Sequence, residues 1–228
     1  MLYPSPASGF HSGGINMSEK KYVITVSRQF GSLGRPIARK LAERLGIKYY
    51  DRDIVDMTAK KMNMRASEIV ELEESVQGGF FRMKYPLGLG TGNIRDQIFE
   101  NQKTIIKELA EKESCVIVGR CADSILYEYE NTMHVYIYAS TEKRFENCKK
   151  EFGMEPNEAR RMMLEVDKAR ERYHLEYAGY LPQDPNYKDL MIDAGILGVD
   201  RTVELLETYV KLFLQCETYK KSKKCIQF

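Results

Sequence analysis

The chain has 228 residues, which is enough for one sizeable α/β domain with a small insertion. Its 35 basic and 33 acidic side chains give a formal charge of +2, which argues against a general nucleic-acid-binding protein, because such proteins rely on an excess of Lys and Arg. Its five cysteines are scattered, which is typical of reduced thiols, and no apolar run reaches the roughly 18 residues of a membrane helix. We therefore expect a cytoplasmic protein that binds neither nucleic acid nor membranes, and the sequence indicates no oligomeric state.

Both ends are expected to lie outside the folded domain. Residues 1–20 contain Pro, Ser and Gly, and Met17 is a second plausible start, so we expect a disordered leader or remnant there. This segment lacks the charged start and apolar centre of a secretory signal. Residues 215–228 are rich in Lys and are expected to form a solvated basic tail.

The first predicted unit is a strand, a glycine turn and a helix. Residues 22–26 are a β-branched run that predicts a buried strand, and apolar residues at helical spacing predict a helix over 34–45. Gly46 ends this helix as a C-cap glycine. A second short strand follows over 47–50, and a helix is expected over 54–76.

The rest of the chain continues to alternate between helices and strands. A glycine-rich stretch over 77–93 predicts a long functional or mobile loop. Then come a helix over 94–110, a strand over 115–118, a strand over 133–139, a charged helical segment over 141–177 interrupted near Gly153 and Pro156, a strand over 190–193 and a helix over 199–214. This order predicts a parallel sheet covered by helices on both faces.

The turn over Ser27 to Arg35 is the strongest functional signal. Turns of this kind direct backbone N–H groups and a helix N-terminus at one point, which favours bound phosphate. Against the standard pattern G-x-x-x-x-G-K-[ST], Gly34 holds the place of the second glycine, Gln29 stands at the first, Arg35 replaces Lys and Pro36 replaces the hydroxyl residue. The motif is therefore degenerate, and a glycine turn that only packs a helix against a strand is the alternative.

Three further segments carry candidate site residues. Asp51 and Arg52 follow the second strand, and Arg120 follows the strand over 115–118, at the sheet edge where ligands bind in open parallel sheets. Arg161, Asp167 and Arg170 lie in the charged helical segment and are candidates for a lid over a transferred phosphate. Each has a structural alternative, namely an exposed turn, a surface Arg after a tight turn and a solvated helix face.

Taken together, these motifs resemble those of the bacterial cytidylate kinase-like family. The resemblance rests on S-R-Q-F-G-S-x-G-R, on A-x-x-L-A-x-x-L-G-x-x-Y-Y-D-R, on V-I-V-G-R and on D-x-x-R-x-x-Y at Asp167 to Tyr173. It implies an α/β fold of the P-loop NTPase type over residues 21–214, with a nucleoside-monophosphate-binding insertion at about 51–100 and a helical lid at about 155–178.

The resemblance also implies phosphoryl transfer from ATP to a nucleoside monophosphate such as CMP or dCMP, with Mg²⁺ as cofactor. Gly31, Ser32, Leu33, Gly34 and Arg35 are then expected to bind the donor phosphates, with Ser32 as a candidate metal ligand. Arg35, Arg161 and Arg170 are the expected catalytic residues, and Asp51, Arg52, Arg120 and Asp167 are expected to bind the acceptor. Two alternatives remain open: a non-catalytic nucleotide-binding or sensing protein, because of Pro36, and a kinase of a small molecule that is not a nucleotide.

Overall fold

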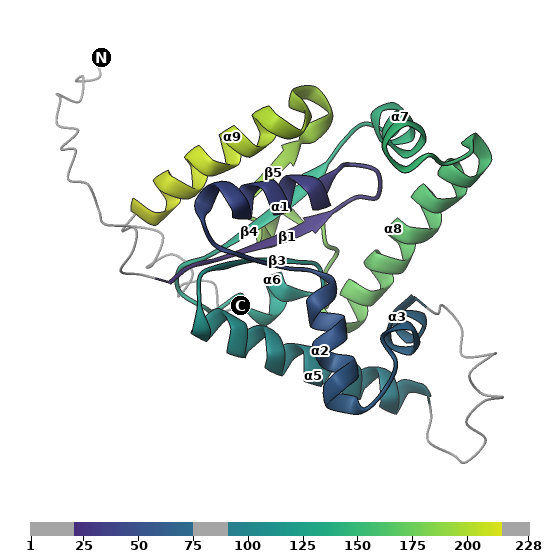
Figure 1. Cartoon of the computed structure of the whole chain (residues 1–228), viewed down its shortest axis with the longest axis vertical. Coiled ribbons are helices and arrows are strands. Elements are labelled where there is room, and N and C mark those ends of the chain that lie inside the picture. Colours follow the sequence, from purple (N-terminus) through teal and green to yellow (C-terminus); the bar gives the residue numbers. More distant parts are fainter. Residues whose placement is uncertain (1–20, 75–90, 216–228) are drawn as a thin grey trace, which may run out of the picture.

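The computed structural model describes residues 21–74 and 91–215 (Figure 1). The predicted leader, most of the glycine-rich loop over 77–93 and nearly all of the basic tail lie outside the described residues. The described part contains a five-stranded sheet in the order β2-β3-β1-β4-β5, in which every pairing is parallel. The strands are β1 (Val23–Arg28), β2 (Lys48–Tyr50), β3 (Cys115–Val118), β4 (Thr132–Tyr138) and β5 (Leu190–Asp193). The predicted parallel α/β sheet is confirmed.

Helices cover both faces of the sheet, as predicted. They are α1 (Gly34–Leu45), α2 (Arg52–Met62), α3 (Ala66–Glu74), α5 (Thr91–Lys112), α6 (Ala122–Ile125), α7 (Thr141–Phe152), α8 (Pro156–Ala178) and α9 (Ala194–Gln215), with a short 3₁₀ helix η1 (Pro185–Tyr187). In Figure 1, α1 and α9 pack together on one face, and α5 with α6 lies on the other. The pair α7 and α8 stands beyond the sheet, at the end where β1 runs into α1.

Successive side chains of each strand point to opposite faces of the sheet, and they are apolar on both faces. Ile24 and Val26 on β1 join the core beneath α1 and α9, whereas Val23 joins the core beneath α5. On β3, Val116 and Ile117 divide between the same two cores. Because each strand is buried on both sides, its sequence is a continuous apolar run rather than an alternating one.

Two predicted helices differ from the structure. The single helix expected over 54–76 was wrong, because Asn63 adopts a left-handed conformation (φ 53°) that ends α2 and lets α3 begin at Ala66. The helix predicted over 199–214 is present, but a short helical stretch that begins at Ala194 precedes it within α9, and Gly198 separates the two with a non-helical backbone (φ 70°, ψ 178°). The short helix α6 was not predicted, since its four residues show no periodic pattern.

The turn between β1 and α1 is packed against α7. The amide of Asn147 donates to the carbonyl oxygen of Gly31 at 2.9 Å. Gly31 itself has φ +78°, and a Cβ at this position would lie 2.8 Å from the carbonyl oxygen of Arg144. Glycine is therefore required here both for its backbone conformation and for the close approach of α7.

A buried ionic cluster fixes the C-terminal end of α8. Asp123 on α6 is 2% exposed and contacts His174, Lys188 and, at 3.5 Å, the hydroxyl of Tyr180. Both ring nitrogens of His174 face oxygen acceptors, namely the Asp123 carboxylate at 3.1 Å and the Tyr180 carbonyl at 2.7 Å. Burial raises the pKa of Asp123, but the hydrogen bond from His174 and the charge of Lys188 outweigh it and hold that pKa well below its usual range.

No helix in the described ranges 21–74 and 91–215 combines the length and the apolar character that crossing a membrane requires.

The close packing at Gly31 can be tested with a matched pair of glycine substitutions. Gly46→Ala also replaces a glycine of positive φ (+66°), but its Cβ would meet nothing within 4 Å. We expect Gly46→Ala to lower the free energy of unfolding by about 1 kcal/mol, and Gly31→Ala by about 2–4 kcal/mol, since it adds overpacking against α7. Chemical denaturation measures both, and equal losses would contradict the packing argument.

The buried cluster predicts that the wild-type protein and Asp123→Asn differ in their free energy of unfolding, and that this difference depends on pH. We expect the variant to lose about 3–5 kcal/mol at pH 7, because the buried ammonium of Lys188 loses its counter-charge. A carboxyl whose pKa is lowered by folding stabilises above its unfolded pKa of about 3.9 and loses that contribution as the pH falls further. The difference in unfolding free energy should therefore be constant from pH 7 to about 5 and shrink below pH 4. A difference that does not depend on pH would contradict the assignment.

Candidate functional site

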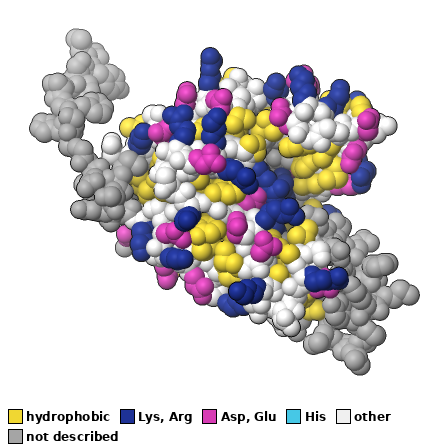
Figure 2. All heavy atoms as spheres, viewed as in Figure 1, with side chains coloured by type: hydrophobic (Ala, Val, Ile, Leu, Met, Phe, Trp, Pro, Cys, Tyr) yellow, Lys and Arg dark blue, Asp and Glu magenta, His cyan; other side chains and the backbone are white. Residues whose placement is uncertain are grey.

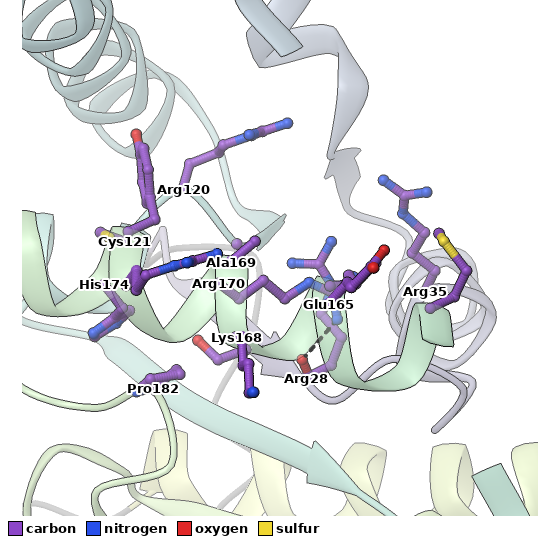
Figure 3. A pocket seen from close by; sticks show the side chains of 16 residues that line it. Arg28, Arg35, Arg120, Cys121, Glu165, Lys168, Ala169, Arg170, His174 and Pro182 are labelled. Carbon is purple, nitrogen blue, oxygen red and sulfur yellow. Dashed lines mark hydrogen bonds between the residues drawn. The ribbon is translucent and has the colours of Figure 1, made fainter. Parts of the chain in front are cut away.

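A pocket of about 570 Å³ opens at the carboxyl ends of β1 and β3, with α8 along its far side (Figure 3). Six cationic side chains and one carboxylate line it, namely Arg28, Arg35, Arg120, Lys168, Arg170 and Arg172 with Glu165. Figure 2 shows dark-blue Lys and Arg side chains gathered between the start of α1 and α2 on this face. The excess of positive charge suits a ligand that carries several negative charges.

The turn before α1 leaves backbone donors available beside this pocket. Leu33, at the N-cap position, has a left-handed conformation (φ 61°) and gives α1 no side-chain cap. Within the described residues, the N–H groups of Gly34 and Arg35 have no hydrogen-bond partner. Uncapped N–H groups together with the helix dipole form an anion-binding site.

Two side chains of the turn hold it against the end of β4, and one of them, Gln29, stands at the position of the first glycine in the standard motif. The side-chain oxygen of Gln29 accepts from the backbone N–H of Ala139 at 3.2 Å. The hydroxyl of Ser32, a residue 1% exposed, faces the carbonyl oxygens of Gln29 at 2.9 Å and of Ile137 at 3.2 Å, to which it donates. This geometry holds the loop in place and does not favour Ser32 as a metal ligand, a role that stays a prediction.

Arg35, at the position of the usual lysine, is paired with Asp51. The two side chains meet at 2.5 Å between Nε and Oδ2, and Asp51 is only 5% exposed. The hydroxyl of Tyr49 donates to the same carboxylate at 3.3 Å. Burial and the charge of Asp51 raise the pKa of Tyr49 to about 12. Much of the charge of Arg35 is therefore already balanced within the protein.

Asp167 joins α8 to the loop over Ser27 to Arg35, which connects β1 to α1. Its carboxylate accepts the backbone N–H of Phe30 at 2.7 Å and forms an ion pair with Arg144 of α7. Arg144 also donates to the Phe30 carbonyl at 3.2 Å. The contacts of Asp167 are thus with the loop, with α7 and with Arg170 of its own helix, and its expected role in acceptor binding stays a prediction.

Arg170 reaches from α8 into the pocket. Its guanidinium donates to the carbonyl oxygen of Arg28 at 3.1 Å, the contact dashed in Figure 3, and lies 3.6 Å from Asp167. Burial, and then the nearby charge of Arg35, lower the pKa of Arg170, while Asp167 opposes this. Arg120 lines the same pocket from the turn after β3, with a left-handed backbone (φ 59°).

The structure does not bring every predicted residue to the pocket. Arg52 is exposed at the start of α2 and lines a separate hollow with Asp56 and Ser67. Arg161 pairs with Glu165 at 3.0 Å on an exposed part of α8 and is not among the residues that line the pocket. The acceptor-binding role of Arg52 and the catalytic role of Arg161 stay predictions without a supporting contact.

Three residues at this site were missed from the sequence. Arg144 and Asn147 of α7 hold the loop, but they stand in a charged helical segment where nothing sets them apart. Arg28 lies in the S-R-Q-F-G-S motif, and its place directly after a buried strand was the available signal.

The described residues do not form a metal-binding cluster of their own. No three His, Cys, Asp or Glu side chains gather in a way that could hold an ion in that part of the chain. The carboxylates of Asp51 and Asp167 are paired with arginines, and Pro36 offers no side-chain oxygen. Mg²⁺ fits this site only as an ion held through the phosphates of a nucleotide, which is common for Mg²⁺.

This chain is similar to several known proteins, of which three are described. A cytidylate kinase of Methanopyrus kandleri is 26% identical over 204 residues, which are 86% of this chain and 96% of that protein. The crystal structure of an uncharacterized protein from Eubacterium ventriosum matches with 27% identity and a TM-score of 0.65, over 84% of this chain and 99% of that one. A shikimate kinase of Bacteroides thetaiotaomicron is more remote, with 14% identity and a TM-score of 0.47 over 86% and 99% of the two chains.

The model of one protein family matches residues 23–196, which is well over half of the chain. The matched segment runs from β1 through the phosphate loop, the pocket and α8 to β5, so it includes every element that builds the site. The resemblance noted from the sequence motifs is thereby confirmed, and this chain belongs to the cytidylate kinase-like family.

Proposed function

We propose that this protein transfers a phosphoryl group from ATP to the phosphate of a small acceptor, with CMP or dCMP as the first candidates. The observation that carries the proposal is the position of the uncapped N-terminus of α1 beside a pocket lined by six cations. Phosphoryl transfer needs little besides groups that position the phosphates and cations around the moving charge, and the N-terminus of α1 and the pocket arginines offer both.

The proposed roles follow from these contacts. The N–H groups of Gly34 and Arg35 would bind the donor phosphates, together with Gly31, Ser32 and Leu33 as parts of the loop. Arg120 and Arg170 would bind the phosphate of the acceptor, because both line the pocket. Mg²⁺, bound with the nucleotide, would neutralise part of the phosphate charge.

The helix α8 is proposed to act as the lid. It lines one side of the pocket, and it contacts the loop through Asp167 and Arg170. Closure of such an element excludes water from the reacting phosphates and brings cations to them. The acceptor region is proposed to extend from Asp51 along α2 and α3.

A nucleotide sensor is the second candidate function, and Pro36 is the observation in its favour. A proline at this position removes both the hydroxyl and one backbone N–H from the usual phosphate loop. A sensor would bind ATP without forming product. A kinase of a small molecule other than a nucleotide also stays open, since the described pocket residues do not identify a base.

A substrate panel tests the proposal directly. With ATP and Mg²⁺, we expect the purified protein to phosphorylate at least one nucleoside monophosphate, CMP or dCMP first, as followed by ADP formation and by direct detection of the diphosphate. The shift in melting temperature caused by ATP is measured in parallel, with and without Mg²⁺. If ATP binds equally well with and without Mg²⁺ and no monophosphate is phosphorylated, the kinase proposal is contradicted and the sensor is favoured.

Two variants of α8 separate the pocket from the rest of the helix. Arg170→Gln removes a cation that lines the pocket, and we expect kcat/KM to fall by about 10²–10³. Arg160→Gln is the matched control, because Arg160 stacks on Phe145 outside the pocket (4.7 Å to the ring centroid). We expect it to stay within about threefold of wild type. Equal effects of the two variants would contradict the proposed role of Arg170.

A further inference from the structure

Arg28 is the last residue of β1, and its side chain lines the pocket. Its Cβ and Cγ lie against Gly34, where a Cβ would come within 2.7 Å of them. Its guanidinium lies at Gly119, where a Cβ would be only 2.4 Å from Nη1. The side chain therefore runs from the start of α1 to the turn after β3, and glycines at both ends make room for it.

Nothing in the described part of the chain satisfies this guanidinium. Nε of Arg28 is buried without a hydrogen-bond partner, and the side chain has no ion pair there. Its surroundings are largely cationic, because Arg170, Arg35 and Arg120 all oppose its charge and only Asp51 favours it. Burial first, and then the charge of Arg170, lower the pKa of Arg28 well below its usual range. Arg28 as a whole is half-buried, and a cation whose Nε is buried without a partner destabilises a protein unless a ligand supplies the counter-charge.

Arg35 differs from Arg28 in each of these respects. Its side chain is 53% exposed, and Asp51 holds it through Nε and Nη2. A ligand phosphate would have to compete with that carboxylate for Arg35, whereas Arg28 has no such competitor. The sequence position of the usual lysine thus carries a cation that is already paired, and the free one stands seven places earlier.

We propose that Arg28, rather than Arg35, is the principal phosphate-binding cation of this site, and that it contacts the phosphoryl group where the donor loop meets the acceptor pocket. The inference deepens the proposed function and rests on it only for the identity of the group that is bound. The ligand chemistry that it requires is a phosphate with two oxygens free for a bidentate contact, since a guanidinium presents two parallel N–H donors.

Pyrophosphate is the probe, because it contains the phosphate groups that donor and acceptor share, and its binding can be measured without turnover. Its dissociation constant is measured by calorimetry for wild type, Arg28→Gln, Arg28→Lys and Arg35→Gln. Arg201→Gln, on the exposed side of α9, is the matched control for loss of one positive charge. Circular dichroism and the melting temperature without ligand are recorded for each variant.

Arg28→Gln is expected to weaken pyrophosphate binding about 10- to 100-fold, as the loss of a charge-assisted hydrogen-bonding pair predicts. Arg28→Lys, which keeps the charge and loses the fork, should weaken it several-fold, and Arg35→Gln and Arg201→Gln by less than about threefold. Without ligand, Arg28→Gln should melt about 2–4 °C higher than wild type, because a charge that has no partner and is opposed by neighbouring arginines is removed. A side chain with a merely structural role would give a lower melting temperature.

Five results would overturn the inference: no pyrophosphate binding by wild type, unchanged binding in both Arg28 variants, a larger loss of binding in Arg35→Gln than in Arg28→Gln, a lower melting temperature of Arg28→Gln, or turnover by Arg28→Gln at the wild-type rate. Failure of the proposed function is distinguishable from these. If no monophosphate is phosphorylated but the pyrophosphate series behaves as expected, Arg28 still binds phosphate and the kinase proposal alone fails. If Arg28→Gln turns over like wild type, the kinase stands and the inference on Arg28 is overturned.

Discussion

The arrangement of the site depends on the contacts that the carboxylate of Asp167 makes. It accepts the N–H of Phe30 in the phosphate loop, pairs with Arg144 of α7 and lies near Arg170 on its own helix. Three segments that are far apart in sequence are thereby joined at one group: the loop, α7 and α8. Because Arg144 is nearly buried, its pairing with Asp167 holds these segments together more firmly than an exposed ion pair would. The position of the pocket wall relative to the loop follows from this contact.

A second carboxylate, Asp51, divides the cations of the pocket into two kinds. Arg35 is paired with it directly, and so its charge is balanced inside the protein. Arg28 is not paired with Asp51. The charge of Asp51 favours the protonated form of Arg28, whereas the charges of several neighbouring arginines oppose it. Among the described residues, the charge of Arg28 is thus left without a counter-charge. If an anionic ligand binds there as we propose, the pocket is a place where stability is lower because function requires it.

The fold was largely readable from the sequence, and the site only partly. The strand and turn from Val23 to Gly34 and the apolar run of β3 carry strong local signals, because buried β-branched residues are followed at once by glycines. The break at Asn63 was not readable, since the helical pattern continues through it and only the left-handed backbone interrupts it. The isolation of Arg28 was hidden for a different reason. It depends on Gly119 lying beside it, and no local pattern in one sequence links residues so far apart.

The failure of the standard motif at Arg35 and Pro36 has a consistent physical explanation in this loop. Pro36 stands in the first turn of α1, where its missing N–H leaves no intrahelical hydrogen bond unmade, so the helix tolerates it. The loop nevertheless presents one N–H fewer to a phosphate than a standard loop would. With the side chain of Arg35 engaged by Asp51, a phosphate bound as we propose would be held by the N–H groups of Gly34 and Arg35, by the helix dipole and by arginines of other elements. A loop weakened in backbone donors therefore goes together with a pocket rich in guanidinium groups, and the two features compensate each other.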